Sequence, residues 1–243
     1  MERLGFSIDS AVAARFPDIR AGGFLVRGLA SASSELDVDS LVESARSTLT
    51  ARIPDPQRIA EDPAIAGWRA AYKQMGLKPS EYKCSAEQLA RRLLKGQAIS
   101  TSLPAVNLYC ALSAKHLAPM GGYDLERLAQ RDISLRFAAP ETDSFEPLGG
   151  RAEDMPLSRN VAVYACGSRI ICWGFNHRDS KETSLQQGTN LAAFFNEAVT
   201  AVQYAALESA FDELRSALVK SGAVVGDIRL ASAGDREIEL MLD

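Results

Sequence analysis

The sequence has few of the residues that most often carry metal-dependent or nucleophilic chemistry. Its 243 residues include only two histidines and four cysteines, and no two cysteines form a CxxC pair. A structural zinc site needs four closely spaced thiol or imidazole ligands, so we expect none here. We expect the thiols to be reduced and mostly buried. They belong to Cys84, Cys110, Cys166 and Cys172.

Long hydrophobic runs are also missing. No apolar stretch approaches the roughly 18 residues that a membrane span requires. The first ten residues already contain Glu2, Arg3 and Asp9, unlike a secretory signal. Apolar residues make up 47% of the chain and charged residues 24%, a composition typical of globular proteins. We therefore expect a cytoplasmic protein that does not associate with a membrane.

An overall excess of positive charge is absent too. The 27 basic and 31 acidic residues give a formal net charge of −4. Nonspecific binding to nucleic acid depends on neutralising phosphates, so indiscriminate binding, including to DNA, is not expected. Basic residues gather between Arg69 and Lys95, where seven of them accompany two acidic residues, a local charge of +5. This segment is either a docking surface for RNA phosphates or a solvated helical face.

Several common catalytic motifs do not occur. The sequence has no GxxxxGK[ST] phosphate loop, no GxGxxG after a strand, no HExxH and no GxSxG elbow. The sequence therefore lacks the usual motifs for nucleotide hydrolysis, dinucleotide redox chemistry, zinc proteolysis and lipase-type acyl transfer. We expect no cofactor and no metal. His177 lies in the polar run 175–180. It is either a base that faces a cleft or a residue of a surface loop. His116 is expected to cap a helix.

Hydrophobic periodicity predicts helices followed by strands and then a further helix. Helical spacing extends over Asp37–Ile53, Arg58–Gly76, Ser85–Lys95, Pro104–Leu117 and Thr200–Lys220. Ser85, with Gln88 three residues later, resembles a capping box. Strand patterns cover Ile19–Leu29, Ile133–Ala138, Asn160–Cys166 and Arg169–Phe175, the last two joined as a hairpin by Gly167-Ser168.

The C-terminal part leaves one assignment open. Asn190–Glu197 fits a strand or the start of a helix, whereas Ile228–Ala231 and Glu237–Leu242 predict a closing hairpin across Gly234-Asp235. This order of elements indicates an α+β fold rather than a regular βαβ series. With no repeat, low-complexity segment or linker in the sequence, we expect residues 1–243 to form a single domain.

Several blocks in a fixed order resemble the freestanding B3/B4 domain proteins, which are similar to the editing domain of the bacterial phenylalanyl-tRNA synthetase beta subunit. The resemblance is strongest over residues 66–199. Its blocks are Trp68–Pro79, Ala90–Gly96, Leu103–Tyr109, Pro119–Leu125, Ile133–Phe137, Glu146–Gly150, Val161–Phe175 and Thr189–Glu197. It implies a mixed or antiparallel sheet flanked by helices.

The resemblance also implies an activity. In that family the domain binds the 3′ end of a mischarged tRNA and hydrolyses the aminoacyl ester, which removes errors that a single binding pocket cannot exclude. Such hydrolysis needs only a positioned water and the terminal ribose hydroxyl, in agreement with the missing triad. The expectation is therefore a trans-editing aminoacyl-tRNA deacylase, a hydrolase that serves translation quality control and has a misacylated tRNA acceptor end as its partner.

Residues carried over from the family give a candidate site. Glu197 matches the acidic residue that reads the amino-acid side chain. Gly121, in a predicted turn over 121–124, stands where the synthetase has a histidine, which opens the pocket. The other substrate-binding candidates are Gly122, Tyr123, Trp173, Asn176 and Asn190. Candidates for holding or activating the water are Asn107, His177 and Thr189. The tRNA-binding candidates are Arg69, Lys73, Arg91, Arg92 and Lys95.

An acidic residue in an opened pocket suits a guanidino-oxy side chain, so the substrate hypothesis is canavanyl-tRNA for arginine. Two alternatives remain. One is deacylation of another mischarged tRNA, and the other is a noncatalytic module that binds tRNA or an amino acid. Each site residue also has a structural reading. Asn107 could brace the backbone, Trp173 could belong to the core, and Asp124 could cap a short helix.

Overall fold

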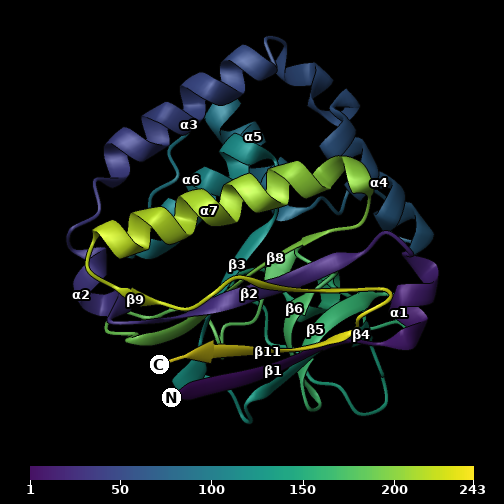
Figure 1. Ribbon diagram of the computed structural model, residues 1–243. Helices are drawn as coiled ribbons and strands as arrows, with labels where there is room; N and C mark the ends of the chain where they lie inside the picture. The colour runs from purple at the N-terminus through teal and green to yellow at the C-terminus, as the bar shows by residue number, and fades with distance from the viewer.

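The computed structural model describes residues 1–243 as two sheets with most of the helices on one side of them (Figure 1). The six-stranded sheet has the order β11 (Glu237–Leu242), β1 (Glu2–Ile8), β4 (Asp132–Phe137), β5 (Ala162–Cys166), β6 (Arg169–Trp173) and β7 (Arg178–Asp179). Only β1 and β4 pair in parallel. The chain ends lie close together, because β1 pairs with β11.

The second sheet carries the residues of most interest. It has the order β10 (Arg229–Ser232), β2 (Arg20–Arg27), β8 (Leu191–Ala198) and β3 (Met120–Asp124), and β9 (Val224–Val225) pairs with β2. All of its pairs are antiparallel. Successive side chains of β8 point to opposite faces, so Phe195 and Glu197 face the six-stranded sheet, whereas Phe194 and Asn196 face the helices.

The seven α-helices are α1 (Ser10–Arg15), α2 (Leu29–Ser33), α3 (Val38–Arg52), α4 (Pro63–Gln74), α5 (Ser85–Leu94), α6 (Pro104–His116) and α7 (Tyr204–Lys220). Most of them lie on the side of the second sheet that faces away from the six-stranded sheet, with α1 and α2 at the edges (Figure 1). Short 3₁₀ helices are η1 (Pro56–Glu61), η2 (Leu125–Arg127), η3 (Ala152–Asp154) and η4 (Ala201–Gln203). None of the helices has the length and apolar character that a membrane crossing requires.

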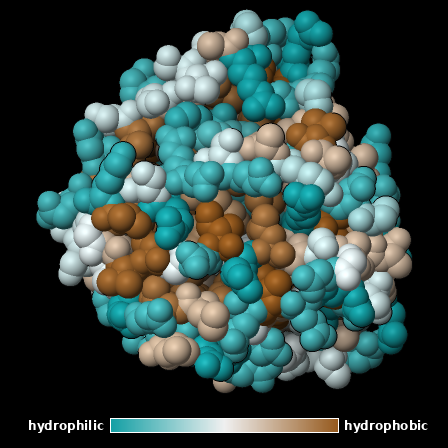
Figure 2. Space-filling view, in the orientation of Figure 1, coloured by the Kyte–Doolittle hydropathy of each residue, from teal (hydrophilic) through white to brown (hydrophobic).

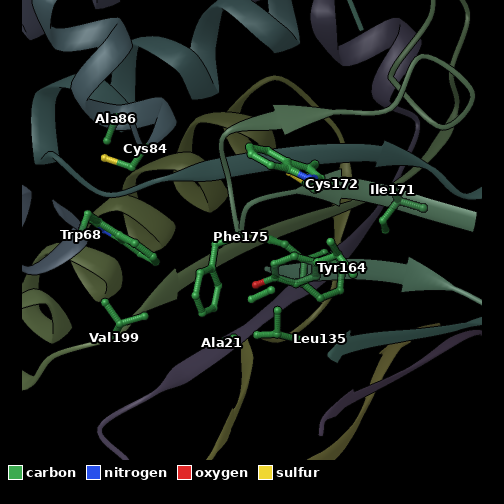
Figure 3. Close-up of a cluster of buried hydrophobic side chains, with 14 of the residues drawn as sticks. Ala21, Trp68, Cys84, Ala86, Leu135, Tyr164, Ile171, Cys172, Phe175 and Val199 are labelled. Carbon is green, nitrogen blue, oxygen red and sulfur yellow. The ribbon is translucent and has the colours of Figure 1, made fainter. Parts of the chain in front are cut away.

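The core has two parts, one on each face of the second sheet. The larger cluster lies between the sheets and under α1, α4 and α5, and includes Trp68, Tyr164 and Phe175 (Figure 3). The smaller cluster joins β2, β3 and β8 to α6 and α7 through residues such as Phe194 and Phe211. Figure 2 shows a mostly hydrophilic outer surface on α7, with apolar side chains gathered below it.

The α+β class with mixed sheets flanked by helices is confirmed. The hairpin across Gly167-Ser168 forms as predicted, and the segment left open at 190–197 is strand β8. The helices predicted over 37–53, 85–95 and 104–117 are α3, α5 and α6. The stretch predicted as one helix over 58–76 is divided into η1 and α4, because Asp62 caps a new helix whose first residue is Pro63.

Three local predictions were wrong. Gly121 and Gly122 lie within strand β3 rather than in a turn. The predicted C-terminal hairpin does not form, because β10 pairs with β2 and β11 pairs with β1. Finally, the N-cap of α5 is Cys84, whose Sγ accepts the Glu87 amide N–H, and not Ser85.

Candidate functional site

A cavity of about 240 Å³ opens between the second sheet, the segment after β6, and helices α5 and α6. Its apolar wall includes Leu89, Val106, Tyr109, Met120, Phe175 and Phe195. Its polar wall includes Ser85, Gln88, Asn176, His177, Asp179 and Glu197. The exposed Arg92 and Leu148 and the half-buried Arg178 also line it. This volume lies below the usual range for sites that enclose drug-sized molecules, so it suits a group the size of one amino acid.

Glu197 is the most deeply buried acidic group of this cavity, with 4% of its surface exposed. The Tyr164 hydroxyl donates to its Oε2 at 2.8 Å, and the Asn176 amide donates to its Oε1 at 2.5 Å. Both donors are uncharged. Burial raises the pKa of Glu197 to about 7, and the two hydrogen bonds oppose that rise. The site therefore holds a carboxyl that lacks a cation.

A left-handed turn after β6 places Asn176. Both Gly174 and Phe175 have positive φ angles, 65° and 58°. This region is uncommon for a bulky residue such as phenylalanine. The conformation persists because the Phe175 ring is fully buried and packs edge-on against Trp68 and Phe16, at centroid distances of 5.5 and 5.2 Å. Core packing thus fixes the strained turn that points the Asn176 amide at Glu197.

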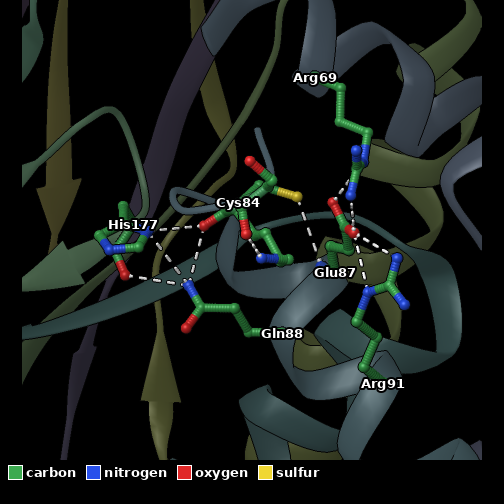
Figure 4. Close-up of polar contacts among 8 residues, drawn as sticks. Arg69, Cys84, Glu87, Gln88, Arg91 and His177 are labelled. Carbon is green, nitrogen blue, oxygen red and sulfur yellow. Dashed lines mark hydrogen bonds and ion pairs between the residues drawn. The ribbon is translucent and has the colours of Figure 1, made fainter. Parts of the chain in front are cut away.

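His177 follows in the same segment, and its ring is held on several sides. Its Nδ1 lies 2.8 Å from the Lys83 carbonyl oxygen, a contact that requires a proton on Nδ1 (Figure 4). The ring packs edge-on against Trp173 and Tyr82 at centroid distances of 5.4 and 5.5 Å. Burial lowers the pKa of His177. The imidazole is therefore neutral near pH 7, with its free lone pair on Nε2.

Asp179 in β7 is a second carboxyl of the cavity. The Tyr123 hydroxyl donates to its Oδ1 at 3.1 Å, and Cys172 stands opposite it in the β6–β7 pair. Burial raises the pKa of Asp179, and the hydrogen bonds from Cys172 and Tyr123 oppose the rise. Gly121 adjoins this pair, since a Cβ at that position would lie 2.9 Å from the Tyr123 hydroxyl oxygen.

The structure brings Gly121, Tyr123, Asn176, His177 and Glu197 together around one cavity. The other predicted pocket residues lie outside its lining. Asn107 braces the segment before α6, where its Oδ1 accepts from the Thr101 amide at 2.8 Å and from the Thr101 hydroxyl at 2.9 Å. This placement agrees with the alternative interpretation of Asn107 as a residue that braces the backbone.

The remaining predicted pocket residues also lie outside the cavity lining. Thr189 donates to the Asp124 carboxylate at 2.7 Å, and Asp124 caps η2. Trp173 is fully buried and donates from Nε1 to the Pro156 carbonyl, so it supports the ring of His177 rather than the cavity surface. Asn190 is exposed, and Gly122 faces Leu185 and Phe194 on the helix side of the sheet.

The basic segment divides into two groups. Arg69 and Arg91 both pair with Glu87, whose side chain is completely buried, at 2.8 and 2.9 Å (Figure 4). The Arg69 pair joins α4 to α5, whereas the Arg91 pair lies within α5, one helical turn from Glu87. Lys73, Arg92 and Lys95 are exposed, and Arg92 also lines the cavity. His116, predicted as a helix cap, contacts Glu213 of α7 through Nε2 at 2.8 Å.

Sequence reasoning did not select Asp179, Tyr164 or Ser85 for the site. Ser85 lines the cavity, and its Oγ is buried without a hydrogen-bond partner. Asp179 stands two residues after His177 in the polar run 175–180, which was the one available signal. Tyr164 reaches Glu197 only because the two sheets pack face to face. No three His, Cys, Asp or Glu side chains are grouped as metal ligands.

Comparisons with known proteins add the following findings. The B3/4 domain family model matches residues 67–216. Among solved structures, an N-terminal fragment of the phenylalanyl-tRNA synthetase beta subunit from Pyrococcus horikoshii is similar, with 12% sequence identity and a TM-score of 0.47. That match covers 90% of this chain and 49% of the other, so the chain spans about half the length of that fragment. No curated protein matches the sequence.

Proposed function

The chain belongs to the B3/4 domain family, and on that premise we propose that it is a trans-acting aminoacyl-tRNA deacylase. In this proposal it binds the acceptor end of a mischarged tRNA and hydrolyses the aminoacyl ester, as a step of translation quality control in the cytoplasm. The observation that carries the proposal is the Glu197 carboxyl, which is buried without a cation in an amino-acid-sized cavity. Burial of such a group is costly unless a ligand supplies its partner.

The proposed substrate is canavanyl-tRNA for arginine. A guanidino-oxy group offers several N–H donors in a planar fork, and this arrangement matches a carboxylate. Both Glu197 oxygens already accept one hydrogen bond each, from Tyr164 and Asn176, which fixes the plane of the carboxyl. Each oxygen retains capacity for another donor. The carboxyl is therefore preorganised to bind a fork of donors.

The proposed chemistry is attack of water on the ester carbonyl. The water adds to the carbonyl carbon and loses a proton, and the ester bond breaks to give the free amino acid and the terminal ribose hydroxyl of the tRNA. The neutral imidazole of His177 can accept that proton through Nε2, because the Lys83 carbonyl holds the other nitrogen as a donor, and the imidazolium returns the proton to the leaving ribose oxygen. The adjacent ribose hydroxyl would assist.

The proposed tRNA contacts begin at the exposed Arg92, which lines the cavity, and continue over Lys73 and Lys95. Such contacts would neutralise phosphates and depend on salt. Arg69 and Arg91 contribute less, because Glu87 already neutralises part of their charge. The proposal treats residues 1–243 as one domain, because β1 and β2 of the N-terminal segment pair within the two sheets.

The decisive experiment is a set of single-turnover hydrolysis assays on charged tRNAs, including canavanyl-tRNA and arginyl-tRNA for arginine. We expect selective loss of the canavanyl ester. Equal hydrolysis of both, or of neither, would remove the canavanine assignment, and selective hydrolysis of a different misacylated tRNA would name the substrate instead. A protein that binds charged tRNA and leaves every ester intact would be a noncatalytic binding module.

A further inference from the structure

The cavity that holds Glu197 contains a second acidic group with no cationic ligand. Asp179 lines the same wall, and its two neighbouring donors, the Tyr123 hydroxyl and the Cys172 thiol, are uncharged. The adjacent Arg178 directs its guanidinium to the Leu148 carbonyl at 3.4 Å rather than to the carboxylate. One small cavity therefore carries two carboxyls, and neither has an ion-pair partner.

Gly121 makes room for the Tyr123 hydroxyl group beside Asp179. A Cβ on Gly121 would lie 2.9 Å from the Tyr123 hydroxyl oxygen and 3.7 Å from Asp179 Oδ1. Gly121 is in regular strand pairing opposite Phe195, and its φ angle is not positive, so the backbone does not require glycine here. The glycine therefore admits the Tyr123 hydroxyl group to the position from which it donates to Asp179 on the cavity wall.

A third feature of the wall is an unpartnered hydroxyl. Ser85 Oγ is buried and makes no hydrogen bond, although the Ser85 amide is bonded to Asn176. Buried polar atoms in proteins are nearly always paired, and an orphan in a cavity wall points to a partner that enters the cavity. The hydroxyl can donate or accept one hydrogen bond, so it adds a polar contact to this wall, and the two carboxyls are the groups that call for donors.

We propose that Asp179 binds the α-ammonium group of the amino acid while Glu197 binds its side chain, so that the cavity selects amino acids with basic side chains. This inference rests on the proposed function, because it assigns the two ends of the aminoacyl group. Two separated cations on one ligand neutralise two separated carboxylates, whereas a neutral amino acid would leave one of them buried and unpaired. The cavity's own arginines form no ion pair with either carboxyl, because Arg92 donates to the Ala98 carbonyl and Arg178 to the Leu148 carbonyl.

Binding of small amides tests the assignment without requiring hydrolysis. Titration calorimetry at pH 7 compares L-canavaninamide, L-argininamide and L-lysinamide with L-norleucinamide, which lacks the side-chain cation, and with the Nα-acetyl form of the tightest basic amide. We expect at least one basic amide to bind about tenfold more tightly than norleucinamide, and Nα-acetylation to remove about tenfold in affinity. Equal binding of norleucinamide, or no effect of acetylation, would overturn the inference.

Variants then assign each carboxyl to one end of the ligand. D179N should bind the free and Nα-acetylated amides equally and still prefer the basic side chain, whereas E197Q should show the reverse pattern. D227N, at an exposed position, is the matched control and should bind as the wild type does. G121A provides a second test at Asp179, with a smaller preference for the free amine expected. If D179N and G121A both keep the full preference, Asp179 is not the ammonium site.

The two proposals fail separately. A protein that shows this binding pattern but hydrolyses no charged tRNA would retain the inference and lose the deacylase function. A protein that hydrolyses a mischarged tRNA but binds norleucinamide as tightly as the basic amides would retain the function and lose the inference.

Discussion

The Asn176 side-chain amide donates a 2.5 Å hydrogen bond to the Glu197 carboxylate, across two chain segments that the left-handed turn at Gly174 and Phe175 brings together. The same amide's oxygen accepts from the Ser85 N–H at 3.3 Å, so Asn176 joins helix α5 to strand β8. The position of the carboxyl thus depends on the backbone of three elements.

E197Q should lose substrate preference while keeping the fold. A glutamine keeps the size of the side chain and one acceptor oxygen but cannot form a charged pair with a basic substrate group. We expect kcat/KM for the preferred charged tRNA to fall by about 10- to 100-fold, the range that a charge-assisted hydrogen bond contributes. Single-turnover hydrolysis, with circular dichroism as the control for folding, measures this. An unchanged rate would make Glu197 a structural residue.

The free energy of unfolding should depend on pH through Glu197. Burial raises its pKa from 4.5 to about 7, so between these values the folded protein retains a proton that the unfolded chain has lost. The corresponding stability is fully present below pH 4.5 and is lost as the pH rises through 7. Asp179, whose pKa is also raised by burial, acts in the same direction.

Urea unfolding at pH 4 to 8 checks this dependence. Relative to E197Q, the wild type should lose up to about 3 kcal/mol over that range, since each pKa unit corresponds to about 1.4 kcal/mol. His177, Arg92 and Arg178 also line the cavity, but they are common to both proteins. E237Q, at an exposed position of β11, should follow the wild type. A constant difference between E197Q and wild type would contradict the raised pKa.

The sequence predicted most elements whose pattern is local. The β5–β6 hairpin follows from two apolar runs around a two-residue turn, and α3 and α6 follow from helical spacing. The glycines of β3 were predicted to form a turn, but they lie in a strand, where their lack of a side chain makes room for neighbours. Beside Gly122 these neighbours are Leu185 and Phe194. Partner choice is not local, so β10 and β11 were assigned to each other although each pairs with a different sheet.

The candidate site was predictable only in part for the same reason. Family resemblance pointed to Glu197, and the polar run suggested His177. The approach of Tyr164 and Asp179 depends on how the two sheets pack and on the pairing of β6 with β7, which no spacing in the sequence encodes. Asn107 was selected by resemblance, yet its amide is occupied by Thr101.

Substitutions at Arg91 and Arg92 should have different consequences, although the two residues are adjacent. R92E reverses an exposed charge at the cavity, and we expect weaker tRNA binding with a shallower dependence of log affinity on log salt. R91E places a second acidic group beside the buried Glu87 in place of a partner, so it should lower the free energy of unfolding by about 3 kcal/mol.

Filter binding across salt concentrations and urea unfolding separate these effects. K220E, at the exposed end of α7, is the control for charge alone. If R92E leaves affinity and salt slope unchanged, the basic segment is a solvated helical face.

H177Q tests the proposed proton acceptor. Glutamine retains a polar side chain but cannot take a proton from water at neutral pH, so kcat should fall by about 10²- to 10⁴-fold while KM changes little. H116Q is the matched control, because His116 pairs with Glu213 and does not line the cavity. Steady-state kinetics on the preferred charged tRNA would reject the role if H177Q and H116Q have equal kcat.

The left-handed turn itself can be tested with one methyl group. Gly174 and Gly76 have similar positive φ angles, 65° and 78°, so alanine at either position should cost about 1 to 2 kcal/mol of stability from backbone strain. Their surroundings differ.

A Cβ at Gly174 would lie 3.3 Å from the His177 Cβ, whereas nothing lies within 4 Å at Gly76. G174A and G76A should therefore lose similar stability in urea unfolding, but only G174A should also slow hydrolysis, because the added methyl displaces His177 and the neighbouring Asn176 amide. Equal hydrolysis by the two variants would show that the turn contributes to folding alone.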